Sequence, residues 1–278
     1  MIPPRIANYF RSYHCIDISK YDETFLWKSL QKRMEANNLL SVEEYYTLLE
    51  VSKEEGKYFL AALQIGYSSF FRNPLTFAVL ERLIFPEIVF NKVNSKRKEI
   101  RIWSAACAAG QEVYSIAILL EELNRGIADP FRYRIFATDY SESLIHDALK
   151  GEYSAYALNN LGLKRVGEWF LKQGEIYTVK PELKTNIEFS HFDLLDEHLS
   201  CPSTSIFGDF DLVFCANLLF YYTKDCQQKI LEKLLNCLSS RGYLITGEAE
   251  REIIMDRGDH EAYPFSAIFN IGEVRRQI

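Results

Sequence analysis

The sequence has no apolar run long enough to span a bilayer, and its first residues lack the hydrophobic segment and small-residue cleavage site of a signal peptide. We therefore expect a cytoplasmic protein without membrane insertion. The six cysteines include no C-x-x-C pair, and the five histidines show no metal-ligand spacing. We interpret the cysteines as small core residues and expect no metal site.

Positive charge is also scarce. Lys and Arg number 32 against 38 Asp and Glu, which gives a net charge of -6. This balance disfavours bulk binding of nucleic acid, and the D/N-P-P-Y/F motif of amino-methyltransferases is missing, so no nucleic-acid partner is expected. Lys28, Lys32 and Arg33 form a local basic patch near the N-terminus, which we interpret as a solvated helix face.

The first seventy or so residues show only helical patterns. Apolar residues recur three and four positions apart, and no strand pattern occurs before Ile100. Ser41 opens the segment Ser-Val-Glu-Glu, in which its hydroxyl and the side chain of Glu44 fit a capping box. We expect an all-helical domain over residues 1–73.

A linking helix is expected next. Pro74 is typical of the first turn of a helix, with Asn73 as its cap. We expect this helix to run through Leu83, and residues 74–98 to form a linking helix and connection.

From residue 99 the pattern changes to alternating strands and helices. A strand, a small-residue turn, a helix, a strand ending in an acid and a second helix follow one another at 100–103, 104–111, 112–123, 133–139 and 141–150. This order is typical of the opening of a doubly wound parallel sheet. We therefore predict an α/β domain over 99–278 with a doubly wound, mostly parallel sheet.

The remaining elements continue this domain. Strands are expected at 210–215, at 243–246 after an Arg241-Gly242 turn, and at 268–271, with a helix at about 224–238. Residues 175–179 and 186–192 alternate as antiparallel strands would. They predict a small β insertion at about 170–190.

The turn after the first strand is a candidate binding site. Residues 104–110 are almost all small, which lets a ligand approach the backbone, and the free N–H groups of the next helix favour an acceptor or carboxylate. A tight strand-to-helix turn needs small residues in any case, so both interpretations stay open. The turn lacks G-x-G-x-x-G and a phosphate-loop lysine, which argues against a nicotinamide oxidoreductase.

Two acids near this turn are further candidates. Asp139 ends the second strand, where its carboxylate could accept hydrogen bonds from both hydroxyls of a ribose; the alternative is a helix cap ahead of Ser141. Glu112 could contact the amino group of a cofactor, or it could only complement the helix dipole.

Five segments resemble, in the same order, the motifs of CheR-type chemotaxis-receptor methyltransferases. They are SFFRN (69–73), IRIWSAACAAGQEVYSIAILL (100–120), FATDYSESLIHDALKGEYS (136–154), NIEFSHFDLL (186–195) and DLVFCANLLFYYTKDCQQKIL (211–231). The helical start, with KRMEANNLLSVEEYYTLL, is similar to the N-terminal domain of the same family. The resemblance covers nearly the whole chain.

The resemblance implies a Rossmann-like methyltransferase fold with a small β insertion and an N-terminal all-helical domain. It implies transfer of a methyl group from S-adenosylmethionine to glutamate carboxylates of a chemoreceptor-like protein, giving glutamate methyl esters and S-adenosylhomocysteine. The expected partner is the cytoplasmic helical region of that receptor, and a monomer is expected. The alternative is a cofactor-binding CheR-like regulator with weak or no catalysis.

The resemblance also implies roles for individual residues. Asp139 would hold the ribose and Glu112 the methionine end of the cofactor. The other implied cofactor contacts are Ala106 and Gly110 in the turn, Arg72 from the inter-domain helix, Asp193 and Leu194 beside the adenine, and Asn217 near the reactive methyl group. Arg72 and Tyr221 are the expected catalytic residues.

Several positions depart from the family pattern. Ser68 stands in place of a threonine, and Gly247-Glu248-Ala249-Glu250 in place of G-H-S-E. Three further departures concern the expected site. Ala216 stands in place of an arginine, Gln111 in place of the first acid of G-E-E-P, and Asp193 in place of an asparagine. The first of these three removes a cation expected near the site. Together these three departures motivate the regulator alternative.

Overall fold

The computed structural model describes residues 2–64, 66–93, 98–205 and 208–271. They fall into two compact units, Met1–Ile65 with Leu218–Lys229, and Gly66–Asn217 with Ile230–Ile278. The chain passes from the first unit to the second after residue 65, whereas the sequence pattern predicts a boundary at 73. The outermost residues of the predicted domains, 1 and 272–278, lie outside the described residues.

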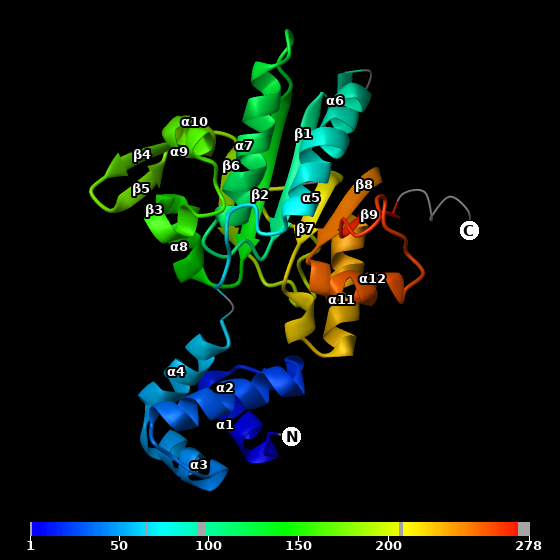
Figure 1. Ribbon diagram of the computed structural model, residues 1–278. Helices are drawn as coiled ribbons and strands as arrows, with labels where there is room; N and C mark the ends of the chain where they lie inside the picture. The colour runs from blue at the N-terminus through cyan, green and yellow to red at the C-terminus, as the bar shows by residue number, and fades with distance from the viewer. Residues whose placement is uncertain (1, 65, 94–97, 206–207, 272–278) are drawn as a thin grey trace. The chain divides into compact units, whose positions relative to one another are not determined.

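The first unit is built from short helices (Figure 1). They are α1 (Pro4–His14), α2 (Glu23–Ala36), α3 (Val42–Val51) and α4 (Lys53–Ala62), with a 3₁₀ turn at Ile18–Lys20. The predicted capping box is confirmed, because Ser41 accepts from the N–H of Glu44 while the Glu44 carboxylate accepts from the N–H of Ser41. Apolar side chains from all four helices, Phe10 and Phe59 among them, form the core of this unit.

Arg33 is not part of a solvated face. Its guanidinium donates hydrogen bonds of 2.8 and 2.6 Å to the carboxylate of Glu55, which is 4% exposed. The hydroxyl of Tyr45 donates to the same carboxylate at 2.8 Å. The interpretation of Arg33 as a solvated residue is therefore wrong, because the buried acid on α4 requires a cationic partner.

A segment from far along the sequence belongs to the same unit. Leu218–Lys229 contains a 3₁₀ turn at Leu219–Tyr221 and the start of α11 (Lys224–Cys237). The N–H of Asp22 donates to the carbonyl of Tyr221 at 2.8 Å. A second bond runs from the N–H of Thr223 to the carbonyl of Lys20 at 3.0 Å, and the rings of Tyr21 and Tyr222 are stacked. These contacts join two stretches that no local sequence pattern could pair.

The second unit is centred on a six-stranded sheet with the order β6-β2-β1-β7-β8-β9. Its strands are β1 (Glu99–Ala105), β2 (Arg132–Asp139), β6 (Ile187–His191), β7 (Phe210–Cys215), β8 (Leu238–Thr246) and β9 (Ile268–Asn270). All neighbouring pairs are parallel except β8 and β9, which are antiparallel. The predicted doubly wound, mostly parallel sheet is confirmed.

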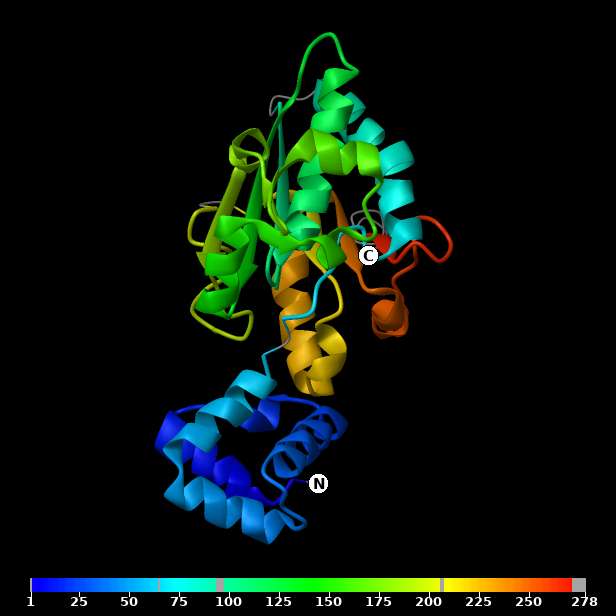
Figure 2. The same cartoon turned by 60° about the vertical axis from the view of Figure 1, so that its left-hand side comes forward.

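The linking helix is longer than the sequence predicts. α5 (Pro74–Val79), a π-helical turn (Leu80–Ile84) and α6 (Phe85–Val93) follow one another without a break, and they are drawn in cyan in Figure 2. The predicted end at Leu83 is wrong, since the π turn passes the chain directly into α6. Asn73 occupies the cap position, but its side chain makes no capping hydrogen bond.

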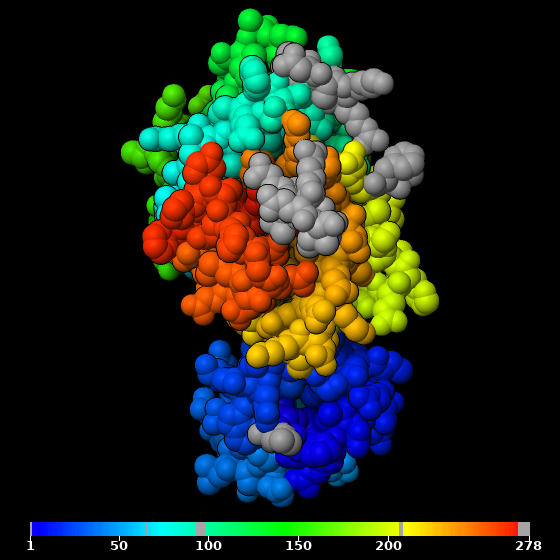
Figure 3. All heavy atoms as spheres, turned by 90° about the vertical axis from the view of Figure 1, so that its right-hand side faces the viewer, coloured from blue at the N-terminus to red at the C-terminus, as the bar shows by residue number. Residues whose placement is uncertain are grey.

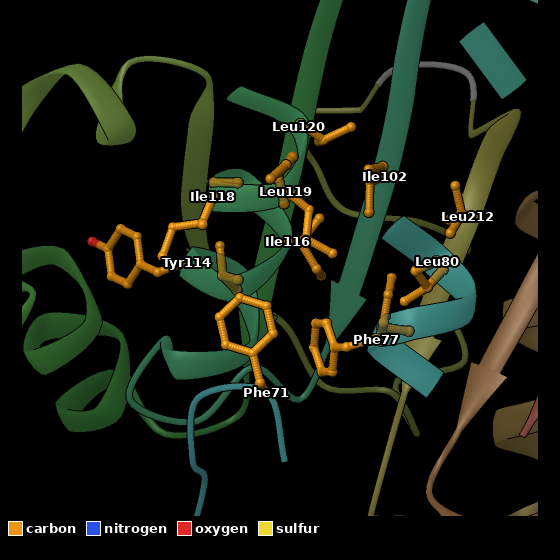
Figure 4. Close-up of a cluster of buried hydrophobic side chains, with 14 of the residues drawn as sticks. Phe71, Phe77, Leu80, Ile102, Tyr114, Ile116, Ile118, Leu119, Leu120 and Leu212 are labelled. Carbon is orange, nitrogen blue, oxygen red and sulfur yellow. The ribbon is translucent and has the colours of Figure 1, made fainter. Parts of the chain in front are cut away.

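The sheet is packed on both faces, as a parallel sheet requires. On one face Ile102 of β1 and Leu212 of β7 lie against side chains of α5, the π turn and α7 (Gln111–Arg125), as Figure 4 shows. Trp103 points to the opposite face because successive strand residues alternate. There its ring lies 5.6 Å from that of Phe210. None of the helices in the described part of the chain is long and apolar enough to cross a membrane.

The small β insertion differs from the predicted one. A three-stranded antiparallel sheet has the order β3-β5-β4, with β3 at Glu152–Ser154, β4 at Phe170–Gln173 and β5 at Ile176–Val179. The remaining helices of this unit are α8 (Glu142–Lys150), α9 (Leu163–Trp169), α10 (Pro181–Lys184) and α12 (Arg251–Met255).

The segment 186–192 was predicted as part of that insertion, and this is wrong. Its strand β6 pairs in parallel with β2 and forms the edge of the main sheet, with Asp139 opposite His191. An edge strand is covered less completely than a central one, and its half-buried side chains explain the alternation that suggested an antiparallel strand.

β8 also corrects the sequence prediction. The strand already begins at Leu238 and runs through the predicted Arg241-Gly242 turn, where its register with β7 shifts. A Cβ atom on Gly242 would lie 2.8 Å from the carbonyl oxygen of Phe210. The glycine therefore permits a close approach of two strands at this irregularity.

Candidate functional site

The carboxyl ends of β1, β2, β7 and β8 lie at one edge of the sheet because these strands are parallel. β1 and β7 are neighbours in space, yet the chain continues from β1 to β2 on one side and from β7 to β8 on the other. Such a reversal of strand order is where open α/β sheets bind ligands, outside the carboxyl ends of the strands.

The turn after β1 has an unusual backbone. Ala106, Ala108 and Gly110 all have positive φ angles, of 63°, 49° and 89°. Non-glycine residues seldom adopt this conformation, and when they do they often lie at functional sites. A Cβ atom on Gly110 would lie 3.0 Å from that of Ala148 on α8, so this glycine is needed for helix packing.

Asp139 holds this turn in place from the end of β2. Its carboxylate accepts a hydrogen bond from the N–H of Ala108 at 2.9 Å and one from the N–H of Ser141 at 2.9 Å. Burial raises the pKa of Asp139 above its ordinary value, and the bonds from Ser141 and Ala108 oppose that rise. The backbone N–H of Tyr140 also lowers the pKa of this carboxylate, so three backbone groups act on its roughly four acceptor sites.

The cap of α8 is Ser141 and not Asp139. The Ser141 hydroxyl accepts from the N–H of Leu144, and α8 begins at the next residue, Glu142. The alternative interpretation of Asp139 as a simple helix cap therefore does not account for its bond to Ala108.

Glu112 lies in the first turn of α7. Although part of the residue is accessible, its carboxyl group is enclosed, and it accepts a hydrogen bond of 2.7 Å from the hydroxyl of Ser104. Burial and the negative charge of Glu250 raise the pKa of Glu112 to about 7, against the opposing effects of Ser104 and Arg72. An acid with this pKa is a candidate for a ligand contact.

Arg72 lies in the segment before α5. Its positive charge acts on Glu112, while its guanidinium donates to the carbonyl of Tyr67 at 3.3 Å and lies over the Tyr67 ring. The segment is fixed to α7 by a hydrogen bond from the N–H of Phe71 to the hydroxyl of Ser115. The positive charge of Arg72 thus lowers the pKa of Glu112, while its guanidinium is hydrogen-bonded to the carbonyl of Tyr67.

Asn217 and Glu250 form the other side of the site. Asn217, just after β7, has a φ of 63°, and its N–H donates to the carboxylate of Glu250 at 2.7 Å. Glu250 is 0% exposed. No role is predicted for Glu250 from the sequence, although it follows the end of β8 by four residues.

Asp193 and Leu194 follow β6 at the same edge. The N–H of Phe192 donates to the backbone carbonyl of Asp139 at 3.0 Å, which places the next two residues beside the end of β2. The Asp193 carboxylate accepts from the N–H of Leu195 at 2.8 Å, and Leu194 is buried.

Tyr221 is the one predicted site residue that belongs to the helical unit. Its ring packs edge-on against Phe25 of α2, with centroids 4.7 Å apart. The other predicted residues all belong to the second unit.

The polar side chains at this edge suit a cationic ligand with hydroxyl groups. Asp139, Glu112 and Glu250 provide carboxylates, whereas Arg72 is the cation that acts on Glu112. Within the described ranges, no group of three or more His, Cys, Asp and Glu side chains could hold a metal ion. A ribose-bearing sulfonium compound fits this chemistry.

Comparison with known proteins gives a consistent result. Residues 67–262 match the family model described as CheR methyltransferase, SAM binding domain, and residues 4–63 match CheR methyltransferase, all-alpha domain. The chain is 31% identical over 227 residues to the chemotaxis protein methyltransferase Cher2 of Pseudomonas putida, covering 80% of this chain and 79% of that protein. It is 27% identical over 256 residues to the chemotaxis protein methyltransferase of Listeria innocua, covering 92% and 91%.

Proposed function

We propose, because the chain belongs to the CheR methyltransferase family, that it transfers a methyl group from S-adenosylmethionine to glutamate side chains of a chemoreceptor-like protein. The products would be glutamate methyl esters and S-adenosylhomocysteine. As a member of this family, the protein is an S-adenosylmethionine-dependent methyltransferase of the CheR type. We propose further that the substrate is glutamate and that the partner is a cytoplasmic helical region of the receptor. We also propose that the protein is a monomer and lies in the cytoplasm.

The single observation that best supports the cofactor site is the anchoring of Asp139. Its carboxylate is fixed at the end of β2 by the N–H groups of Ala108 and Ser141, which would orient it toward the ribose hydroxyls. Glu112 would hold the amino group at the methionine end. The adenine would lie beside Asp193 and Leu194, and Asn217 would line the floor of the site. The turn at Ala106 and Gly110 would let the ligand approach the protein backbone closely.

When bound, S-adenosylmethionine supplies a methyl group on a positively charged sulfur. An ionised carboxylate is a competent nucleophile for it, and a glutamate with a reference pKa of about 4.3 is already ionised at neutral pH. No general base is needed, so the protein has to orient the acceptor carboxylate. Arg72 is the proposed residue for holding that carboxylate, and Tyr221 is proposed to donate a hydrogen bond to it.

One observation favours the regulator alternative. The Oε1 atom of Gln111 is buried without a hydrogen-bond partner among the described residues. The family has an acid at this position and an arginine at position 216, where this chain has Ala216. Both changes alter the charges around the proposed site, and they are compatible with cofactor binding without efficient transfer.

The decisive experiment measures transfer of labelled methyl from S-adenosylmethionine to a cytoplasmic receptor fragment. We expect alkali-labile label on glutamate residues and none on a fragment whose glutamates are replaced by glutamine. Arg72→Ala should lower transfer about 100-fold or more while changing cofactor affinity much less, as expected for a residue that acts on the acceptor. Cofactor binding without any transfer would support the regulator, and equal losses of binding and transfer would make Arg72 a cofactor ligand only.

A further inference from the structure

The segment that carries Arg72 has a strained backbone. Phe71, directly before Arg72, has a φ of 47°, which is unfavourable for a residue with a side chain and persists only where the surroundings enforce it. The peptide bond between the two residues is planar, so the conformation of Phe71 sets the direction in which Arg72 leaves the segment. The hydrogen bond from the Arg72 guanidinium to the carbonyl of Tyr67 is long, at 3.3 Å, and Tyr67 is 72% exposed. The position of Arg72 therefore depends largely on what holds Phe71.

The backbone of this segment is held by two side chains. The N–H of Phe71 donates to the hydroxyl of Ser115 on α7 at 3.1 Å. The carbonyl of Phe70 accepts from the side-chain amide of Asn160 at 3.0 Å. Asn160 lies in the connection between β3 and α9, so the segment is tied both to the main sheet's helix α7 and to the small β insertion.

The two phenylalanine rings of the segment are enclosed as well. The ring of Phe70 packs edge-on against Tyr153 of β3 and Phe170 of β4, with centroids 5.0 and 5.5 Å away. Figure 4 shows the ring of Phe71 beside that of Phe77 on α5, and these two centroids are 5.0 Å apart. Each ring is therefore fixed by a different part of the second unit.

Arg165 of α9 packs on the ring of Phe71. Its guanidinium carbon lies 4.7 Å from the ring centroid, within the range of a cation–π contact. The same guanidinium donates to Glu122 of α7 at 3.0 and 2.7 Å and to Glu81 of the π turn at 2.9 Å. Paired hydrogen bonds to a carboxylate fix the plane of a guanidinium as well as its position. Two acids thus hold Arg165 so that it presents a fixed flat surface to Phe71.

The chain after Arg72 is anchored independently of Arg165. The hydroxyl of Thr76 on α5 donates to the carbonyl of Ser266 at 2.7 Å. The chain after β8 is drawn orange to red in Figure 3, where it lies beside the cyan segment that contains α5. Because the α5 end of the segment is fixed in this way, Arg165 acts on the end formed by Phe70 and Phe71.

We propose that Arg165 is a positioning residue, which holds Phe71 in its left-handed conformation and thereby directs Arg72 toward the acceptor carboxylate. Asn160 contributes to the same task through the carbonyl of Phe70. This inference rests on the proposed function of Arg72. A small displacement of a residue that orients a reacting group is costly to the rate, so loosening Phe71 should slow transfer. Because Arg165 acts through Arg72, its removal should matter for transfer only while Arg72 is present.

The test is a double-mutant cycle in the full chain, with transfer of labelled methyl to the receptor fragment as the measurement. At saturating substrates Arg165→Ala should lower the rate about tenfold and change the affinity for S-adenosylmethionine less than about twofold. In the Arg72→Ala background the same change should lower the rate less than about twofold, because the residue that Arg165 positions is gone. Equal losses in the two backgrounds would overturn the inference, since they would show a general effect on the fold.

The matched control is Arg125→Ala. Arg125 also forms an ion pair, with Glu168, and its guanidinium lies 4.2 Å from the centroid of an aromatic ring, that of Trp169. Both partners belong to α9 and neither to the segment 70–72. Transfer by this variant should stay within about twofold of the wild type. A loss as large as that of Arg165→Ala would overturn the inference.

Asn160→Ala covers the case in which Arg165→Ala does not fold. It removes one hydrogen bond to the carbonyl of Phe70 and should lower transfer about threefold, again only while Arg72 is present. A second measurement, NMR titration of Glu112, does not depend on transfer. Both variants should raise the pKa of Glu112, as Arg72→Ala does, because the cation that lowers it is displaced. A wild type that transfers no methyl would overturn the proposed function, whereas an unchanged pKa of Glu112 in both variants would overturn the role of Arg165 alone.

Discussion

Each unit of the molecule contains an enclosed glutamate, and the two differ in what surrounds them. Glu55 of the helical unit receives hydrogen bonds from Arg33, Tyr45 and Asn37. Burial raises the pKa of Glu55, but these partners outweigh burial and leave it below its ordinary value. The pKa of Glu112 instead rises to about 7, because burial is opposed only by one hydroxyl and by the charge of Arg72.

This comparison separates two uses of a buried acid. A carboxylate whose hydrogen bonds are made within the protein stabilises the fold, and removing it leaves its cation unpaired. A carboxylate held in its less stable ionised form costs stability, and a cationic ligand can recover that cost. The experiments below test whether Glu55 and the acids of the candidate site divide in this way.

The largest effect is expected from Glu55→Gln. This change leaves the guanidinium of Arg33 without its carboxylate, and we expect the helical unit to lose about 3 kcal/mol of unfolding free energy. Denaturant unfolding of the full chain, with amide exchange of α2–α4 to locate the loss, measures it. The pKa of Glu55 in the fold lies below its ordinary 4.5, so the stabilisation should fade as the pH falls below about 4.5.

The control for this change is Glu43→Gln, which removes the carboxylate of an exposed ion pair with Arg5. Exposed pairs contribute little, so its effect should be much smaller. If the two variants lose the same unfolding free energy, Glu55 has no special structural role, and the contrast between Glu55 and Glu112 does not hold for Glu55.

Asp139→Ala should have the next largest effect, on ligand binding. Loss of a charged acceptor for two ribose hydroxyls is expected to weaken S-adenosylmethionine binding about 100-fold in calorimetry. The change also removes the acceptor for the N–H of Ala108. A disturbed turn therefore has to be distinguished from the lost contact with the ribose. The wild type should discriminate against an S-adenosylhomocysteine analogue that lacks both ribose hydroxyls, and the variant should not. Equal discrimination by both proteins would remove the ribose assignment.

Asp139 on one side of this site could be predicted from the sequence, whereas Glu250 on the other side could not. Asp139 could be located because it ends an apolar strand after a small-residue turn, and both signals are local. The segment 210–215 was predicted as a strand because it is an apolar run, which is also a local signal. Pairing is not local: the parallel position of β6 beside β2 and the attachment of Leu218–Lys229 to the helical unit depend on contacts between distant residues. Glu250 was missed because the N–H groups that donate to it, those of Asn217 and Gly247, meet only when β7 and β8 are neighbours.

Glu112→Gln should change stability in the direction opposite to Glu55→Gln. Because the pKa of Glu112 is about 7 in the fold and 4.5 ordinarily, the folded state retains a proton between these values, and wild-type stability falls as the pH rises from 4.5 to 7. Glutamine does not titrate. We therefore expect the variant to gain about 2 kcal/mol relative to the wild type as the pH rises from 4.5 to about 6.5. Ligand-free thermal unfolding across this range measures it, and a constant difference would contradict the raised pKa.

The smallest effect concerns the pH dependence of cofactor binding. If Glu112 holds the ammonium group of S-adenosylmethionine, its ionised form is the binding form, and affinity should rise about eightfold between about pH 6 and about pH 7.5. Above that range the ligand's own amino group, with a reference pKa of about 8, begins to lose its proton, and the affinity should fall again. Glu112→Gln should keep only this falling part, because the ligand still titrates and the protein group does not. A rising part that survives in Glu112→Gln would assign the titration to another residue, and the contrast between Glu112 and Glu55 would then rest on stability alone.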